Sequence, residues 1–322
     1  MATDQHPDPL SASHAELPAS GLPDIAADRA THRIAALDWV GMEAIALPIR
    51  VVDAGSDVRI PAQLSVEVDL RADATRGIHM SRLYLALDAA VAEPLSPAML
   101  AALLRTLLAS HAGLSTRVRV RFAFDHFLRR AALASGHSGW RRYPATVTAT
   151  LERDAVSIEV GFDVVYSSTC PASTALARQL VAEDFGRAFP AAAAIDRDAA
   201  IRWLAGEHGM RATPHSQRST ANVRVRLDPA APAIGLAALI DRAEDALGTA
   251  VQGAVKRIDE QAFARRNGEN PMFCEDAARR LHAAFAAGAV AGVLDVVVRV
   301  AHHESLHVHD AVASVGDPGV AV

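Results

Sequence analysis

Apolar residues alternate with polar ones in several separate segments of this chain, and this pattern limits the fold most strongly. It runs through residues 62–70, 118–124, 145–153, 155–165 and 221–227. Because successive side chains of a strand point to opposite faces, each segment predicts a strand with one buried face. Asp154 alone separates two of these segments, which predicts a hairpin there. Residues 294–301 form a further apolar run that predicts the last strand.

Helical segments are interspersed with the strands in two rounds. The predicted helices cover residues 96–111, 173–189, 236–247 and 275–287. Ser96 can cap the first of them, and Pro97 suits its first turn. We expect short strands and turns in residues 31–60 and an irregular, alanine-rich stretch in residues 190–212. This order indicates an α+β fold with mostly antiparallel pairing and two similar halves.

Composition excludes several classes of protein. The chain has 322 residues, of which 51% are hydrophobic, so it can bury the core of one large or two modest domains. Its net charge of −5 and the lack of a long basic block argue against nucleic acid or an anionic membrane as partner. Two cysteines are too few for a disulfide framework and favour a reduced, cytoplasmic protein. No apolar run reaches the roughly 18 residues of a membrane span, and the first thirty residues resemble a flexible tail rather than a secretory signal.

Cys170 lies where a strand is expected to end and a helix to begin, in the string YSSTCP at residues 166–171. The free N–H groups at the start of a helix favour a thiolate. Thiolate, imidazole and carboxylate together can form a catalytic metal site. The alternative is a buried cysteine that packs as a small apolar side chain.

Imidazole and carboxylate groups gather in three other segments. These are TPHSQRS (213–219), FCED (273–276) and HHESLHVHD (302–310). Pro214 keeps His215 out of a helix, and the four histidines of the last segment indicate metal binding or proton transfer rather than packing. The charged residues of the other segments can also be explained without a functional site. The run 256–261 is typical of a solvated helix face, and acids in the first turn of a helix complement its dipole.

Eight strings, taken in order, resemble GTP cyclohydrolase type IB, a prokaryotic metal-dependent family. They are GIHMSR, SGHSGW, YSSTCP, ALARQL, ATPHSQRS, DEQAFAR, MFCEDAARR and ESLHVHDA, and the resemblance as a whole runs from about residue 38 to residue 313. Each string is modest alone, but the ordered set is specific. The resemblance implies a tunnelling fold, in which antiparallel sheets carry helices on one face and two modules per subunit build a homotetrameric barrel. The modules would be residues 31–165 and 166–313, between a disordered tail at 1–30 and a frayed tail at 314–322.

The reaction that this resemblance implies is hydrolysis of GTP to formate and 7,8-dihydroneopterin triphosphate, the first step toward folate-type pterins. It implies a divalent metal as cofactor, with Mn²⁺ first and Zn²⁺ or Fe²⁺ as alternatives. The implied metal ligands are Cys170, His215, Glu260 and His307. The implied catalytic residues are Cys170, Glu304 and His307. Substrate binding is implied for Glu275, which would hold the guanine edge, and for the triphosphate cations Arg82, Arg218, Lys256 and Arg257.

The chain departs from the family pattern at a few positions. Ala172 stands where many relatives carry a second cysteine, and residues 190–208 form a variable stretch. Two other functions stay open: another tunnelling-fold enzyme acting on a pterin or deazapurine, and a metal-binding relative without activity. Retention of all four implied metal ligands argues against the inactive relative.

Overall fold

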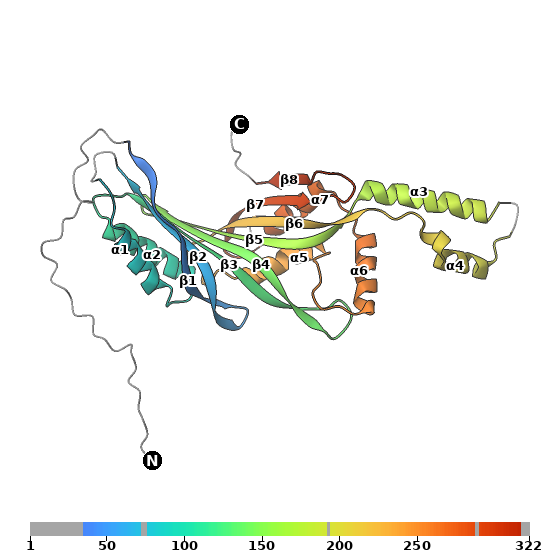
Figure 1. Ribbon diagram of the computed structural model, residues 1–322, viewed down its shortest axis with the longest axis horizontal. Coiled ribbons are helices and arrows are strands. Elements are labelled where there is room, and N and C mark those ends of the chain that lie inside the picture. Colours follow the sequence, from blue (N-terminus) through green and yellow to red (C-terminus); the bar gives the residue numbers. More distant parts are fainter. Residues whose placement is uncertain (1–34, 72–75, 192–193, 287–289, 317–322) are drawn as a thin grey trace, which may run out of the picture.

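The eight strands form one antiparallel sheet in chain order, with β1 and β8 at its two edges (Figure 1). This computed structural model describes residues 35–71, 76–191, 194–286 and 290–316, so the tail expected at 1–30 lies outside the described residues. The strands are β1 (Leu37–Asp53), β2 (Ser56–Leu70), β3 (Arg117–Ala131), β4 (Ser138–Glu152), β5 (Ala155–Thr169), β6 (Ser216–Leu227), β7 (Val293–His302) and β8 (Ala311–Val315). The helices are α1 (Met80–Ala90), α2 (Pro97–Ser110), α3 (Pro171–Ala188), α4 (Arg197–Ala205), α5 (Leu236–Leu247), α6 (Arg257–Glu269) and α7 (Cys274–Phe285).

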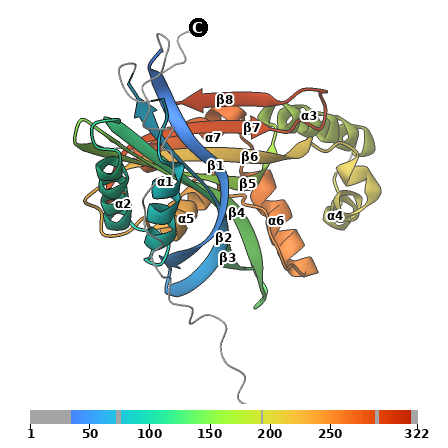
Figure 2. The same ribbon diagram turned by 60° about the vertical axis from the view of Figure 1, so that its left-hand side comes forward.

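One face of the sheet packs against α1, α2, α5 and α7, whereas α3, α4 and α6 lie beyond the end of the strands (Figures 1 and 2). Alternate residues of each strand point into this layer, as Val118, Val120 and Phe122 do in β3. The rings of Phe162 and Phe285 lie 6.4 Å apart and join β5 to α7. The structure therefore has the α+β class, the antiparallel pairing and the one-sided helices that the sequence predicts. None of the helices in the described ranges has the length and apolar character needed to cross a membrane.

The first two strands form a long hairpin, so the prediction of short strands in residues 31–60 is wrong. Ala54 and Gly55 both have positive φ, at 48° and 77°, which suits a two-residue hairpin turn. Pro48 of β1 lies opposite Pro61 of β2, and neither proline has a backbone N–H to donate to the sheet. The sheet tolerates both because β1 is an edge strand and because β2 pairs with β3 only from Ala62 onward.

Several other expectations can be compared with the structure. The hairpin around Asp154 is confirmed, and Ser96 Oγ caps α2 by accepting from Met99 N at 3.2 Å. Residues 190–212 are not wholly irregular, because they contain α4 and a short 3₁₀ turn. β8 continues to Val315, so residues 314 and 315, assigned to the tail, belong to the sheet; residues 317–322 lie outside the described residues.

Asp259 joins the β3–β4 loop to the start of α6. Its Oδ1 accepts from the N–H groups of Ala134 and Ser135, both at 2.8 Å. Its Oδ2 accepts from Ser135 Oγ at 2.6 Å and from Lys256 N at 2.8 Å. These hydrogen bonds, with the Ser135 hydroxyl first, hold the pKa of the Asp259 carboxyl far below its usual range. The string SGHSGW is therefore fixed by a buried carboxylate at its first residue.

Asp259→Asn is expected to lower the urea midpoint of unfolding at pH 7. An Asp carboxyl has a pKa of about 3.9 in an unfolded chain, and its folded pKa is lower here. The ionised group therefore stabilises the fold above about pH 4, and this contribution is lost as the pH falls. The difference in urea midpoint between wild type and variant should therefore become smaller as the pH falls. Urea titrations at several pH values measure this difference, and Glu260→Gln is the neighbouring exposed control. A difference in midpoint that grows in acid would contradict the assignment.

Candidate active site

A strip of buried polar side chains crosses β5, β6 and β7 at the end of the sheet where α3 and α7 begin. Tyr166 and Ser168 of β5 lie opposite Ser219 and Gln217 of β6, and Ser219 lies opposite His302 of β7. All five residues are at most 7% exposed. Buried polar groups cost free energy unless they are hydrogen-bonded, so a strip of them at one strand end indicates a site rather than a core.

Tyr166 and His302 share a hydrogen bond of 2.9 Å between the phenol oxygen and Nε2. Burial lowers the pKa of His302 to about 4 and raises the pKa of Tyr166. Both groups are therefore neutral near pH 7. The negative charge of Glu275 opposes part of the effect of burial on the pKa of His302.

Cys170 is the N-cap residue of α3. Its Sγ accepts from Ser173 N at 3.5 Å, so the sulfur lies against the free N–H groups of the first turn, as the sequence predicts. The backbone N–H of Cys170 donates to the carbonyl of His215 at 3.2 Å. His215 N donates in turn to Ser173 Oγ at 3.1 Å. These bonds hold the start of α3 and the start of β6 together.

His215, Gln217 and Glu304 form one hydrogen-bonded group beside Cys170. Nδ1 of His215 lies 3.0 Å from Gln217 Oε1 and 3.6 Å from Glu304 Oε2. Gln217 Nε2 donates to Glu304 Oε1 at 3.3 Å and to Ser168 Oγ at 3.0 Å. The side chains of His215 and Glu304 are only 18% and 11% exposed. Glu304 Oε2 is buried and has no hydrogen-bond partner among the described residues.

Glu275 lies in the first turn of α7, next to Cys274. Hydrogen bonds from its own backbone N–H and from the Cys274 thiol hold the pKa of the Glu275 carboxyl below its usual range. Burial raises the pKa of Cys274 to about 11, so this thiol stays protonated and donates to Glu275 at 3.2 Å. Met272 N donates to the carbonyl of Thr169 at 3.0 Å, which brings the start of α7 next to the end of β5. The Glu275 side chain itself is exposed in a single copy of the chain.

Two of the four implied metal ligands lie apart from this group. His307 is exposed in the β7–β8 loop and stacks on His309, with ring centroids 5.2 Å apart. Glu260 is exposed in the first turn of α6, whose opposite end leads toward Met272. A helix rises about 1.5 Å per residue, so Glu260 lies roughly 13 Å along the axis from Glu269 at the end of α6. Within the described ranges no three His, Cys, Asp or Glu side chains converge as a metal site.

The four cations implied for the triphosphate do not gather at Cys170 either. Arg82 of α1 donates to the carbonyl of Ser110 at 3.1 Å, and Figure 1 shows α1 at the opposite side of the molecule from α3. Lys256 and Arg257 begin α6 and are exposed beside the β3–β4 loop. Arg218 alternates with Gln217 and Ser219 in β6 and so points to the helix-free face of the sheet.

The donors near the start of α3 are of the kinds that a divalent metal takes. Cys170 and His215 offer sulfur and nitrogen, and Glu304 offers a buried oxygen that lacks a hydrogen-bond donor. Such an unsatisfied acceptor is costly in a protein interior, and a cation would satisfy it. The starts of α3 and α7 add the partial positive charge of two helix N-termini. The chemistry of the group fits the implied cofactor.

Sequence reasoning missed three members of the site. Gln217 was one donor among several in its string, and Tyr166 and His302 were parts of longer strings. A usable signal was present, because residues 166 and 168 share one strand face, as do 217 and 219. What was missing was the register between β5, β6 and β7, which sets these pairs opposite one another.

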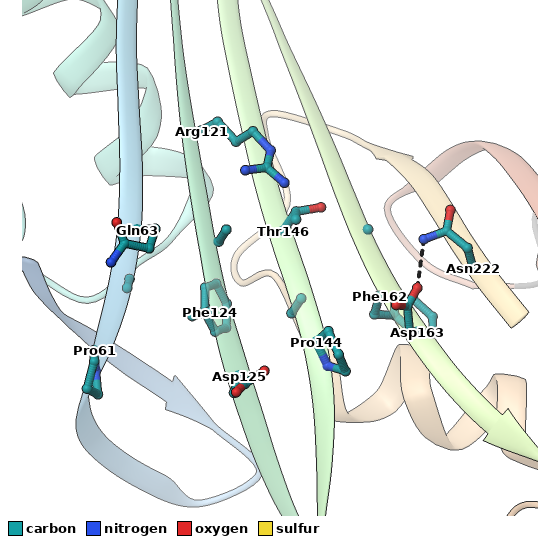
Figure 3. A pocket seen from close by; sticks show the side chains of 14 residues that line it. Pro61, Gln63, Arg121, Phe124, Asp125, Pro144, Thr146, Phe162, Asp163 and Asn222 are labelled. Atoms are coloured by element: carbon teal, nitrogen blue, oxygen red, sulfur yellow. Dashed lines mark hydrogen bonds between the residues drawn. The ribbon is translucent and has the colours of Figure 1, made fainter. Parts of the chain in front are cut away.

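A separate hollow of about 590 Å³ lies on the helix-free face of the sheet (Figure 3). Arg121, Thr146, Asp163 and Asn222 line it, and Asn222 Nδ2 donates to Asp163 Oδ1 at 2.8 Å. None of the implied site residues is among its lining residues. The face is polar, in contrast to the apolar face that meets the helices.

Comparison with known proteins identifies the family. The family described as "Type I GTP cyclohydrolase folE2" matches residues 22–313. The chain is 48% identical over 293 residues to "GTP cyclohydrolase FolE2" of Pseudomonas putida (strain GB-1), covering 91% of this chain and 95% of the relative. It is 48% identical to the protein of the same name from Azotobacter vinelandii (strain DJ / ATCC BAA-1303), covering 91% and 98%. The chain also resembles a solved structure of uricase from Arthrobacter globiformis, with a TM-score of 0.47 and 10% sequence identity. The match covers 90% of this chain and 96% of the uricase. At this TM-score the likeness supports no conclusion about function.

The sequence match extends over both the strands and the helices that surround Cys170, His215 and Glu304. Its residues 22–313 contain every residue implied for the site. The chain belongs to the type I GTP cyclohydrolase FolE2 family.

Proposed function

We propose that this protein hydrolyses GTP to formate and 7,8-dihydroneopterin triphosphate in the pathway to folate. The observation that carries the proposal is the family match over residues 22–313. The geometry supports it, because the cysteine that the family resemblance singles out caps α3 beside an imidazole and a buried carboxylate. Hydrolysis of the guanine ring needs an activated water and a group that transfers protons, and this cluster offers residues for both.

A divalent metal, when bound, would make a hydroxide available near neutral pH. We propose Cys170 and His215 as ligands, completed by His307 and Glu260. Manganese, zinc and iron(II) all suit a site of mixed sulfur, nitrogen and oxygen donors. Glu304 is the proton-transfer group, because its Oε2 is buried 3.6 Å from His215 Nδ1 and has no hydrogen-bond partner among the described residues.

Glu275 is proposed to hold the guanine edge. Its carboxyl is ionised at neutral pH, since hydrogen bonds keep its pKa low. An ionised carboxylate accepts from both N1–H and the 2-amino group of guanine. Adenine presents no such donor pair, so it would leave the carboxylate unpaired. Tyr166 and His302 are neutral and hydrogen-bonded to each other at the same end of the sheet.

We propose that the working protein is a homotetramer of the tunnelling fold, with modules at residues 31–165 and 166–313. Both edges of the sheet, β1 and β8, lack a further strand in the described part of the chain. Edge strands carry unpaired backbone N–H and C=O groups, which a second copy can pair. The helix-free face is polar and hollowed, as the lining of a tunnel would be (Figure 3).

Assembly would also complete the active site. Glu260, Lys256 and Arg257 share the start of α6 and Arg82 lies on α1, whereas Cys170 caps α3, and no hydrogen bond or ion pair of the described residues joins any of the four to Cys170. We propose that a second copy brings the α6 group to this site. Arg218, on the helix-free face, would meet the triphosphate from the tunnel side.

Co-expression of two inactive variants tests this arrangement. Cys170→Ala and Glu260→Ala should each lack activity alone. If the two residues act from different copies, random mixing restores about one intact site in four. The measurement is neopterin production by co-expressed, doubly tagged protein, with separately purified and mixed proteins as the control. No recovery in co-expressed protein would contradict a site shared between copies.

The proposed activity itself is tested with purified protein and GTP. The protein is stripped with a chelator, reloaded separately with Mn²⁺, Zn²⁺ or Fe²⁺, and incubated with GTP or ATP. Oxidation converts the expected product to fluorescent neopterin, and formate is measured in parallel. We expect both products from GTP and neither from ATP. Formate without neopterin would instead indicate a different ring-opening reaction.

A further inference from the structure

We infer that Gln217 is a positioning residue that fixes which nitrogen of His215 carries the proton, and so leaves Nε2 bare for the metal. The inference rests on the proposed function in one respect, because it takes His215 to be a metal ligand. It adds a residue that no comparison assigns. Gln217 is 7% exposed, and its amide lies between His215 and Glu304.

The orientation of the Gln217 amide is determined by its neighbours. Nε2 lies 3.0 Å from Ser168 Oγ and 3.3 Å from Glu304 Oε1. A carboxylate has no hydrogen to donate, so the amide group that faces Glu304 must be the NH₂. Ser168 Oγ is 2.8 Å from Ser219 Oγ, and its hydroxyl hydrogen can be given to that neighbour while it accepts from Gln217. Turning the amide over would place its oxygen 3.3 Å from the Glu304 carboxylate, so that two acceptors would face each other with no hydrogen between them.

This orientation decides the state of the imidazole. Gln217 Oε1 can only accept, and it lies 3.0 Å from His215 Nδ1. Glu304 Oε2, the other group near Nδ1, is also an acceptor, at 3.6 Å. A neutral imidazole facing two acceptors at Nδ1 carries its hydrogen there. Nε2 then keeps its lone pair, and a metal ligand needs that lone pair.

One side chain thereby orients both functional groups. Gln217 holds His215, which precedes it in the chain, and Glu304, which belongs to the β7–β8 loop. Its Nε2–H bond to Oε1 leaves Oε2 as the free oxygen of Glu304. Loss of the Gln217 amide would therefore remove a hydrogen bond from both the His215 imidazole and the Glu304 carboxylate, and both side chains would lose their fixed orientation. Partners of this kind typically change metal affinity by about 10- to 100-fold when removed.

Nitrogen-15 NMR of histidine-labelled, metal-free protein measures the tautomer directly. The protein has 14 histidines, so the spectrum of His215→Asn identifies the signal by its absence. We expect the wild-type protein to show hydrogen on Nδ1 and a bare Nε2. Gln217→Leu should move the hydrogen toward Nε2. Ser216→Ala removes a neighbouring hydrogen bond but leaves the Gln217 amide in place, so it should retain the wild-type tautomer, whereas a loss caused by general disruption of this strand end would appear in both variants.

Metal affinity gives the second readout. Competition with a chelator should show a fall of about 10- to 100-fold in Mn²⁺ affinity for Gln217→Leu. Ser216→Ala is the matched control, because it removes the neighbouring hydrogen bond to Thr169 at 2.9 Å without touching His215. Circular dichroism of each variant confirms that it is folded.

The outcomes separate this inference from the proposed function. Hydrogen on Nε2 in the wild type overturns the inference, and so does a Gln217→Leu variant with unchanged tautomer and unchanged metal affinity. A tautomer that follows Gln217 and a metal affinity that falls with it support the inference, whichever substrate the enzyme takes. Absence of GTP hydrolysis by the metal-loaded wild type would reject the proposed function and leave both of these measurements standing.

Discussion

Cys170→Ala is expected to abolish neopterin production from GTP. Residues that merely orient a metal ligand change affinity by about 10- to 100-fold, and loss of a ligand itself should exceed that range. Cys170 caps α3 with its sulfur, and its backbone N–H donates to the carbonyl of His215, the proposed nitrogen ligand. Activity and bound metal should therefore be lost together. The measurements are neopterin fluorescence and metal content after dialysis.

Cys274→Ser is the matched control for this change. Cys274 is buried, its pKa is raised to about 11, and its thiol donates to Glu275 rather than acting as a thiolate. A serine hydroxyl can donate to the same carboxylate, so this variant should still form product and hold metal. Full activity in Cys170→Ala would show that the sulfur is not a ligand, and the proposed metal site would have to be abandoned.

Glu275→Gln is expected to lower kcat/KM for GTP by about 150-fold. The carboxylate would accept two charge-assisted hydrogen bonds from guanine, and at about 1.5 kcal/mol each their loss corresponds to roughly 3 kcal/mol. The low pKa of Glu275 keeps it ionised throughout the neutral range, so the effect should not depend on pH there. Steady-state kinetics with GTP and ATP measure the change.

Asp276→Asn provides the comparison for Glu275. Its carboxylate accepts from Phe273 N at 3.0 Å at the start of α7, so the substitution affects the same helix turn without reaching the base. We expect a small effect on kcat/KM. Equal turnover of GTP and ATP by the wild type would reject the role of Glu275 as the guanine anchor.

The strands could be predicted where one face is buried throughout. Ile158, Val160 and Phe162 alternate with more polar residues, and the structure buries all three. β1 was missed because its alternation is interrupted. Ala44 has a positive φ of 56° at a shift in register, and Pro48 looks like a strand breaker. Both features are acceptable in an edge strand, and nothing local in the sequence shows which strand lies at the edge.

The candidate site could be predicted in part. The end of a strand and the start of a helix placed Cys170 correctly, because both are local patterns. The meeting of His215 with Glu304 depends on β6 and β7 being neighbours, which is a long-range property. The position of Glu260 depends on the direction of α6, which Asp259 fixes through the β3–β4 loop. Only the folded chain shows that Glu260 belongs to no converging group of His, Cys, Asp or Glu side chains in the described ranges.

The open edges of the sheet have a consequence for how the protein accumulates in a cell. In the proposed assembly, a newly made chain would present β1, a strand of seventeen residues whose outer edge is bridged at Arg50 to Pro94, as an open edge until it met a second copy. At low concentration, chains would remain unassembled for longer, and unassembled chains can aggregate through the open edge or be degraded. The rate of synthesis would then govern how much of the polypeptide becomes enzyme, because crowded nascent chains find one another sooner.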